Sequence, residues 1–251
     1  MLTLKGLIIR EEPRGESSKC IYALTAEYGV ICIFVRGGMK SKKNSSPTQL
    51  YAYSTLCLDE KPGKGGDHRQ FYLDSAEAEN MFYDLRLNIK KMALAAYLCE
   101  LLFYSRVQAF DKNEIMRLAL NTFYFINNGK RDIEFLKSLF EFRLLCENGL
   151  RPDLLACKHC CAYESETMYF NLYSENIECE NCCQNKEGLL TFAFDKTMLY
   201  IVRHIALTDF DRLFNLKISP GYQKQLTNFT EEFVKYHFKD KFDTLDFYRS
   251  I

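Results

Sequence analysis

The sequence lacks an excess of charge of either sign, because its 251 residues carry 33 Lys and Arg against 33 Asp and Glu. Attraction of nucleic acid by global charge is therefore excluded, and any such contact has to come from a local basic patch. Long apolar runs are also missing. The longest, Met92 to Cys99, is far too short to cross a bilayer, which takes about 20 apolar residues.

The common catalytic signatures are absent as well. There is no G-x-x-x-x-G-K-[ST] loop, no G-x-G-x-x-G, no H-E-x-x-H and no G-x-S-x-G elbow. His68, His204 and His237 have no evident catalytic partners in the sequence. These absences exclude the enzyme classes that depend on such motifs.

The first six residues lack the apolar run of a signal peptide. Eleven cysteines in a chain of this length then indicate a reduced, cytoplasmic protein, and not a small secreted one held by disulfides. We expect the scattered cysteines to behave as small buried apolar residues. These are Cys20, Cys32, Cys57, Cys99 and Cys146.

What the sequence does contain is two C-x-x-C pairs, with 18 residues between Cys160 and Cys179. This spacing is typical of a four-cysteine zinc site. Two thiolates three positions apart on a tight turn can reach one ion at about 2.3 Å, and two such turns complete a tetrahedron. Because no position is left for water or substrate, the pattern indicates a structural site. We predict one Zn²⁺ bound by Cys157, Cys160, Cys179 and Cys182.

Four alternatives to this ligand set stay open. Cys161 and Cys183 double the second cysteine of each pair, so the register of the ligands could slip by one residue. His159 could replace a thiolate, and four thiolates also suit an iron–sulfur cluster. The spacing could also be accidental among buried cysteines. Zinc-binding C-x-x-C turns often have a glycine in a left-handed conformation just after the second cysteine. This chain has Cys161 and Cys183 there, so the sequence leaves the local turn geometry open.

Residues 1 to about 73 are predicted to form five short strands. Each is rich in Val, Ile, Leu or Tyr and is bounded by turn residues. Five short strands in about 75 residues predict a small barrel. The predicted strands are Leu4 to Arg10, Lys19 to Thr25, Val30 to Arg36, about Gln49 to Leu58, and about Gln70 to Leu73.

A basic loop separates the third and fourth predicted strands. From Tyr28 to Leu58 the chain has four basic residues and no acidic one. Such a loop on a small barrel could follow a phosphate backbone, and a merely solvated loop is equally consistent with the sequence. The candidate phosphate contacts are Arg36, Lys40, Lys42 and Lys43.

From about Tyr83 onwards the apolar residues recur with the period of a helix. Neither the helices before the cysteines nor those after them are long enough for a bundle, so we expect them to pack together. The cysteine segment is then an excursion from one helical domain. Apolar stripes run from Leu85 to Phe103, from Ile115 to Ile126 and from Asp132 to Leu144, and further helices begin near Asp195 and near Pro220.

The order of these parts resembles the RecO family of bacterial recombination mediators. The resemblance spans nearly the whole chain and rests on short motifs in a fixed order. These are Gly15-Glu16-Ser17-Ser18-Lys19 with Leu24-Thr25-Ala26-Glu27-Tyr28-Gly29, then Arg36-Gly37-Gly38-Met39-Lys40-Ser41-Lys42, then Ala95-Ala96-Tyr97-Leu98-Cys99-Glu100-Leu101, and last Phe140-Glu141-Phe142-Arg143-Leu144-Leu145 followed by Gly149, Pro152 and the first cysteine pair.

The resemblance implies a multidomain α+β fold in which an OB-fold β-barrel precedes an α-helical domain with an inserted four-cysteine zinc knuckle. The expected boundaries are residues 1–75 for the barrel, 76–150 and 189–251 for the two helical parts, and 151–188 for the insertion. An OB-type barrel offers single strands a groove with stacking aromatics. The candidates are Tyr22, Tyr28, Phe34, Tyr51 and Tyr53, and alternation does not tell which of them are core.

The resemblance also implies the function. The family is not enzymatic, binds single- and double-stranded DNA, and anneals complementary strands. It helps to load RecA onto strands coated by single-stranded-DNA-binding protein, works with RecR, and recognises the acidic C-terminal tail of the coating protein. A nucleoid-associated, cytoplasmic location follows. Some members lack the cysteines, so the zinc is a scaffold.

Two other classes of function remain open. One is a zinc-ribbon DNA-binding regulator, which needs no strand annealing. The other is a thiol redox enzyme that uses one C-x-x-C pair. A redox C-x-x-C normally accompanies a βαβ pattern, whereas here the pairs follow a predicted helix and come doubled.

Overall fold

The computed structural model describes residues 1–37, 45–62, 69–105, 112–239 and 242–251. The chain forms two compact units, which we describe separately. The first contains Met1–Ile133 together with Phe242–Ile251, and the second contains Glu134–Lys241. Each unit brings together helices from before and after the cysteines.

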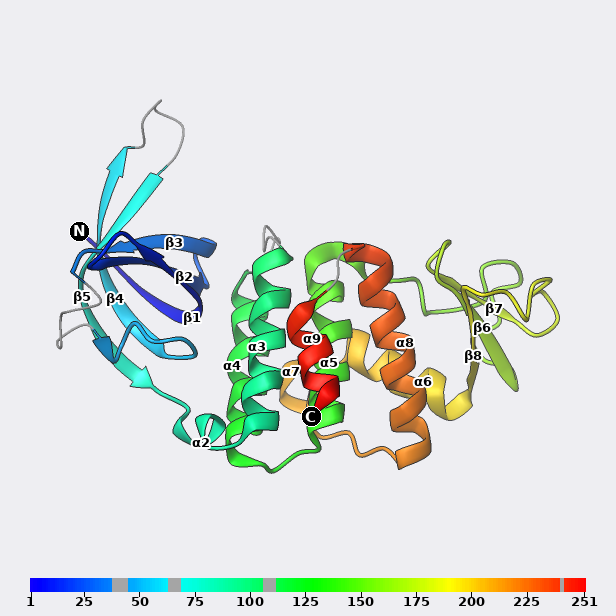
Figure 1. Ribbon diagram of the computed structural model, residues 1–251. Helices are drawn as coiled ribbons and strands as arrows, with labels where there is room; N and C mark the ends of the chain where they lie inside the picture. Colours follow the sequence, from blue (N-terminus) through cyan, green and yellow to red (C-terminus); the bar gives the residue numbers. More distant parts are fainter. Residues whose placement is uncertain (38–44, 63–68, 106–111, 240–241) are drawn as a thin grey trace. The chain divides into compact units, whose positions relative to one another are not determined.

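The first unit begins with a closed five-stranded barrel in the order β1-β2-β3-β5-β4 (Figure 1). Its strands are β1 (Leu2–Arg14), β2 (Ser18–Thr25), β3 (Gly29–Val35), β4 (Tyr53–Pro62) and β5 (Arg69–Asn80). The barrel closes where β3 and β5 pair in parallel, with Ile33 opposite Phe71 and Phe34 opposite Tyr72. The predicted barrel is thus confirmed, and it has the OB-like form expected.

Alternation decides which barrel residues are core. Along β3, Ile31, Ile33 and Val35 are buried in the apolar core, while Cys32 and Phe34 point the other way. The fourth strand begins at Tyr53, and its expected start at Gln49 is wrong. Tyr51 has a left-handed φ of 70°, which an extended strand cannot contain.

Helices complete the first unit. They are α2 (Tyr83–Arg86), α3 (Ile89–Tyr104), α4 (Lys112–Asn128) and α9 (Asp243–Ser250). The helix expected from Leu85 to Phe103 is divided in two, because Asn88 is extended and its side chain caps α3 by accepting the Lys91 N–H. Helix α9 packs along α3, where the rings of Tyr97 and Phe242 meet at 5.8 Å.

The second unit combines helices with a small sheet. Its helical elements are α5 (Ile133–Leu145), η1 (Cys146–Leu150), α6 (Lys196–Leu207), α7 (Phe210–Leu213) and α8 (Pro220–Phe238). The helices expected near Asp195 and near Pro220 are confirmed. The sequence analysis missed the antiparallel sheet β7-β6-β8, formed by β6 (Thr167–Asn171), β7 (Asn176–Cys179) and β8 (Thr191–Asp195).

One face of this small sheet is apolar and packs on α8. Phe170 of β6 and Phe194 of β8 are buried, and their rings lie 5.3 and 5.2 Å from that of Phe229. The opposite face carries Tyr169, Asn171 and Thr191, which follow the alternation of the strands. The cysteine segment is therefore folded onto a helix by aromatic packing.

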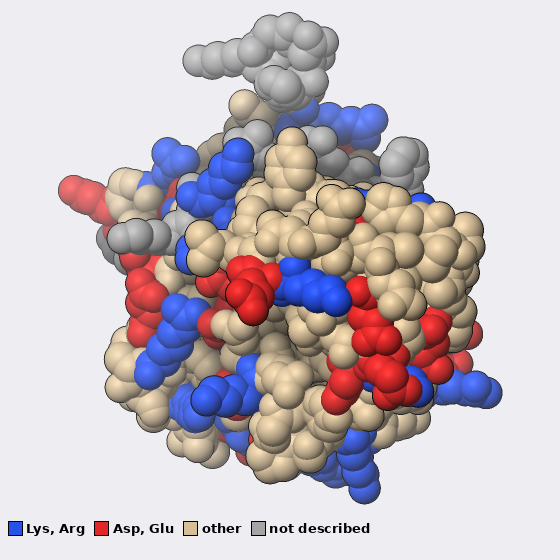
Figure 2. Space-filling model, turned by 90° about the vertical axis from the view of Figure 1, so that its right-hand side faces the viewer, with Lys and Arg blue, Asp and Glu red and all other residues tan. Residues whose placement is uncertain are grey.

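The cysteine segment is acidic. Residues 151–195 contain eight Asp and Glu against three Lys and Arg. In Figure 2, acidic and basic side chains of the described residues form small groups interspersed with uncharged surface. A surface of this kind does not attract a polyanion over long distances.

Candidate metal centre and nucleic-acid interface

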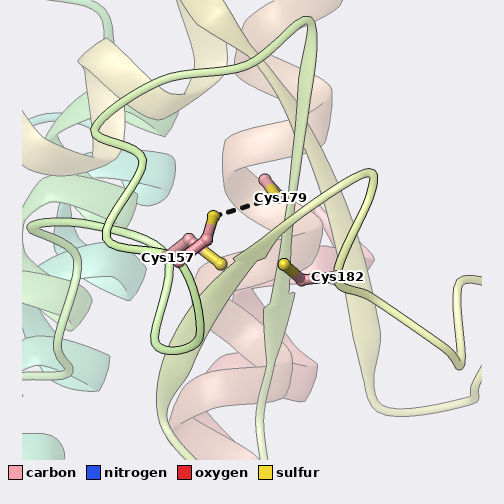
Figure 3. Close-up of side chains that lie close together, drawn as sticks. Cys157, Cys179 and Cys182 are labelled. Carbon is pink, nitrogen blue, oxygen red and sulfur yellow. Dashed lines mark hydrogen bonds between the residues drawn. The ribbon is translucent and has the colours of Figure 1, made fainter.

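The two C-x-x-C pairs converge. One sulfur from each of Cys157, Cys160, Cys179 and Cys182 lies within 4.8 Å of the others. The sulfurs point toward a common centre, and that of Cys179 lies 3.6 Å from that of Cys160 (Figure 3). Cys157 and Cys179 are buried, Cys182 is half-buried and Cys160 is exposed. Four sulfur donors in this arrangement fit a metal that takes tetrahedral thiolate ligands, as Zn²⁺ does.

Backbone hydrogen bonds hold each pair in a tight turn. The Cys161 N–H donates to the Cys157 carbonyl at 2.9 Å, and the Cys183 N–H donates to the Cys179 carbonyl at 2.9 Å. Cys161 has a φ of 59°, so this cysteine adopts the left-handed conformation that glycine usually supplies. The open question about the turn geometry is answered there: the turn forms without the glycine.

The flanking candidates lie outside the sulfur cluster. Cys161 and Cys183 do not belong to it, and the imidazole of His159 instead lies 3.7 Å from the Glu178 carboxylate. Glu178 in turn accepts the Lys158 ammonium at 2.6 Å. The geometry therefore favours the register that uses the first and fourth residue of each C-x-x-C.

The thiols of the cluster differ in acidity. Burial opposes the charged form of Cys157, but backbone N–H groups of Cys160, Cys179 and His159 outweigh this and lower the pKa of Cys157 to about 6. Hydrogen bonds with the thiols of Cys179 and Cys160 raise the pKa of Cys182 to about 12. One thiolate thus forms readily at neutral pH, and a bound metal would displace the protons of its neighbours.

Arginine joins the cysteine segment to α6. The Arg203 guanidinium donates to the carbonyls of Leu154, Leu155 and Tyr163 at 2.7 to 2.8 Å. It also lies 4.0 Å from the centre of the Tyr163 ring. These contacts, with the phenylalanines of the sheet, fix the knuckles on the helices of the second unit.

A second candidate site lies on the outer face of the barrel. The rings of Phe34 and Tyr72 are stacked at 5.3 Å with an interplanar angle of 25°. The Arg36 guanidinium lies 5.0 Å from the Tyr72 ring centre, and the Lys61 ammonium lies 5.1 Å from it. We call these four residues the stacking platform. Half-exposed aromatic rings beside cations are typical of surfaces that bind single-stranded nucleic acid, because bases stack on the rings and phosphates contact the cations.

The structure also sorts the other aromatic candidates. Tyr51 is buried, and Tyr22 packs edge-on against Phe103 at 5.0 Å. Tyr28 packs on Phe71 of the core. Sequence reasoning missed Tyr72 and Lys61, although alternation along the predicted last strand could have placed Tyr72 opposite to Phe71.

The basic-loop candidates are only partly described. Arg36 is exposed and belongs to the stacking platform. Lys40, Lys42 and Lys43 lie outside the described residues. Their contact with phosphate stays a prediction.

Several cations of the helices are already engaged. Lys137 is fully buried between Glu141 at 2.9 Å and Glu231 at 2.7 Å. Arg143 donates to the carbonyls of Ile205 and Thr208 at the end of α6. These two side chains build the second unit and are poor candidates for a recognition site.

Comparison with known proteins identifies the family. Residues 1–68 match the family model described as Recombination protein O N terminal, and residues 86–246 match Recombination protein O C terminal.

Among the described residues, no helix is both long and apolar enough to span a membrane.

Similar proteins carry the same name. DNA repair protein RecO of Acetivibrio thermocellus is 24% identical over 253 residues, covering 100% of this chain and 97% of the relative. DNA repair protein RecO of Alkaliphilus metalliredigens is 23% identical over 256 residues and is covered in full. That of Dehalococcoides mccartyi is 27% identical over 217 residues, with 86% of this chain and 82% of the relative covered. Since the two family models together match most of the sequence, the chain belongs to the RecO family of DNA repair proteins.

Proposed function

We propose that this protein is a non-enzymatic recombination mediator that binds single- and double-stranded DNA and anneals complementary strands. In this role it helps to load RecA onto strands coated by single-stranded-DNA-binding protein, together with RecR. Membership of the family supports the proposal. The stacking platform is the single structural observation that carries it.

The stacking platform fits the chemistry of an unpaired strand. Base–aromatic stacking stabilises such complexes by about 1–3 kcal/mol per base and tolerates any sequence, because every base has a π-face. Arg36 and Lys61 stand on the same ring and can meet the phosphates that flank a stacked base. Sequence tolerance is what a protein that anneals arbitrary strands needs.

We assign one structural Zn²⁺ to Cys157, Cys160, Cys179 and Cys182. The convergence of four sulfurs supports this assignment. Zinc is preferred to an iron–sulfur cluster because two short turns closing on one centre suit a single ion. When bound, the ion would cross-link the two knuckles and would leave no coordination position for substrate.

The alternative of a zinc-ribbon regulator is less well supported. Such a protein presents its metal module to DNA, and here that module carries eight carboxylates against three cations. Phosphate contacts require the opposite balance of charge. The barrel, with its stacked rings and cations, is the better candidate for the DNA interface.

The acidic tail of the coating protein needs an apolar floor with a basic rim. We propose that such a site lies on the helices of this protein, but not on Lys137 or Arg143, which are already engaged. A peptide with the tail sequence should bind in a salt-dependent manner, and removal of its terminal aromatic residue should abolish binding.

An annealing assay with protein-coated complementary strands tests the main proposal. The full chain should accelerate annealing, and Phe34→Ala with Tyr72→Ala should remove most of the acceleration. Cys161→Ser is a matched control, because this cysteine is exposed and lies outside the sulfur cluster. Unchanged annealing by the double variant would contradict the proposed role of the stacking platform.

A further inference from the structure

The outward side of α6 carries large apolar side chains. A helix on a protein surface normally presents polar residues to solvent. In α6, Tyr200 and Leu207 lie on the outward side, and both are more than half exposed. Arg203 follows Tyr200 by three positions and precedes Leu207 by four, so the three side chains form one strip along the helix.

The first cysteine knuckle widens this strip. Its Leu155 and Tyr163 are also more than half exposed. The Arg203 guanidinium donates to the carbonyls of Leu155 and Tyr163 at 2.8 and 2.7 Å, and it lies 4.0 Å from the centre of the Tyr163 ring. The four apolar residues are therefore neighbours of one arginine. We call Leu155, Tyr163, Tyr200, Arg203 and Leu207 the apolar face.

The apolar face has the properties of an interaction site. Single apolar residues on a surface are common, whereas contiguous exposed ones mark a contact with another molecule. Tyrosine and arginine are also enriched at the centres of protein interfaces. The face is fixed before binding, because Arg203 holds the knuckle and the Leu155 N–H donates to the Asp153 carboxylate at 3.1 Å. Little loop freedom is then lost when a partner binds.

The charges beside the apolar face are acidic. Within two positions of its four apolar residues in the chain, the charged residues are Asp153, Glu164 and Asp209, and all three are exposed. The Arg203 guanidinium is already engaged with carbonyl oxygens and a ring. A partner with lysine or arginine beside its apolar residues would complement this rim, whereas an acidic peptide would be repelled. The face is therefore distinct from the site proposed above for the acidic tail.

The shape of the apolar face favours a helix as the partner element. A helix surface such as that of α6 has no free backbone groups with which an extended segment could pair. Tyr200 and Leu207 are seven positions apart and span about 10 Å along the axis. Two turns of a second helix, with apolar residues at i, i+3, i+4 and i+7, cover the same length.

We propose that the apolar face docks a basic amphipathic helix of a partner protein. The apolar side of that helix packs on Tyr200, Leu207 and the knuckle residues, and its lysine or arginine residues meet the acidic rim. The cysteine segment stays a scaffold with respect to DNA, and its first knuckle completes a surface for protein. Docking requires neither DNA binding nor annealing, so it can be tested independently of the proposed function.

The test titrates the full-length protein into a fluorescein-labelled synthetic helix of about 18 residues, long enough to form in water. One side of the peptide carries Leu at helical spacing, and Lys flanks that side. Fluorescence anisotropy should show saturable binding that weakens with salt. Tyr200→Ala with Leu207→Ala keeps good helix formers in α6 and should weaken binding about tenfold or more, as expected for central interface residues. Its unfolding temperature, metal content and DNA affinity should not change.

A matched control removes one leucine and one tyrosine elsewhere. Leu87→Ala with Tyr124→Ala truncates two exposed side chains of the first unit and should leave peptide binding unchanged. Glu164→Lys with Asp209→Lys reverses the charge of the rim. This variant should weaken binding of the Lys-flanked peptide and strengthen binding of the same peptide with Glu in place of Lys.

Four results would overturn the proposed docking. They are no saturable binding of the Lys-flanked peptide, equal affinity in the Tyr200→Ala, Leu207→Ala protein, an equal loss in the control pair, and equally tight binding of the Glu-flanked peptide to the unaltered protein. Sedimentation of the protein alone provides a further check. Self-association that disappears in the Tyr200→Ala, Leu207→Ala protein would assign the face to a second copy of this chain instead.

Discussion

The barrel and the cysteine segment are both small β structures, and they use their aromatic residues in opposite ways. In the barrel, a closed core is filled mainly by aliphatic residues together with Phe71, and Phe34 and Tyr72 stack on the outside. In the cysteine segment, Phe170 and Phe194 point inward onto α8, and the outer face is polar. The closed barrel has a core of its own, so these two outer rings are not needed to fill it.

The three-stranded sheet cannot use its aromatic residues in that way. A sheet of this size buries little apolar area by itself and needs a helix or a metal for stability. Its phenylalanines therefore pack on Phe229 of α8, and the sulfur cluster brings the two C-x-x-C turns together. On the proposed function the barrel carries the binding surface and the cysteine segment is a scaffold, and the predictions below test that division.

The largest effect is expected from removal of a metal ligand. Cys157→Ser should abolish stoichiometric zinc and unfold the cysteine segment, because structural zinc contributes about 10–16 kcal/mol in zinc-finger peptides. DNA affinity should stay within about twofold if the barrel holds the interface. Metal analysis, thermal unfolding and DNA titration measure the three quantities.

Cys161→Ser is the control for this substitution and should keep one zinc. If the Cys157→Ser protein retained zinc, or the Cys161→Ser protein lost it, the proposed set of four ligands would be wrong. A parallel fall in DNA affinity would show that the scaffold and the binding surface are not separate.

The next effect concerns the helical core on which the cysteine segment packs. Lys137→Met leaves the fully buried Glu141 without its ammonium partner, although Thr230 still donates to it at 2.7 Å. Breaking a buried ion pair from one side costs about 3–5 kcal/mol. Denaturant unfolding should show a loss of this size, whereas the exposed Lys235→Met in α8 should change little.

The basic loop is expected to contribute phosphate contacts, which make DNA affinity depend on salt concentration. Replacing Arg36, Lys40, Lys42 and Lys43 together by Ala removes up to four phosphate contacts. The slope of log affinity against log salt should then become shallower by about three units, because each contact contributes roughly 0.7 to 0.9. Fluorescence titrations from low to high salt measure the slope, and an unchanged slope would return this loop to a solvated role.

The two rings of the stacking platform, unlike its cations, should contribute to binding independently of salt concentration. Phe34→Ala and Tyr72→Ala should each weaken single-strand binding by about 1–3 kcal/mol while the salt slope stays the same. Tyr22→Phe is a control, since this ring is engaged against Phe103 and keeps its packing. A changed salt slope in the platform variants would mean that base stacking on these rings and the phosphate contacts are coupled.

The smallest effect expected is a pH dependence in the second unit. Burial lowers the pKa of His237, and the nearby Glu175 opposes this only in part. Between that lowered pKa and the ordinary value near 6.5, the unfolded chain binds a proton that the folded chain does not, so stability falls as pH falls through this window. His237→Gln should remove this part of the pH dependence in unfolding experiments at pH 5 and pH 7. An identical dependence in the variant would exclude His237 as its source.

The cysteine cluster and the barrel were predictable because their signals are local. The spacing of Cys157, Cys160, Cys179 and Cys182 limits which sulfurs can meet, and a C-x-x-C turn needs few residues to form. Strands β2 and β3 are likewise readable, because each is a short run rich in Val, Ile, Leu or Tyr bounded by turn residues. The small sheet was missed because β6 and β7 span only five and four residues, too few for a clear period.

The sequence by itself determined the order of the parts, the four cysteines whose sulfurs converge, and the family. The tertiary structure decided which aromatic rings are exposed, since Phe34 meets Tyr72 only when the parallel pairing of β3 and β5 closes the barrel. It also decided that Lys137 is core and not surface, because Glu231 lies 94 positions away in the chain. Local patterns specify elements, whereas contacts between distant segments specify which of their faces remain free to bind.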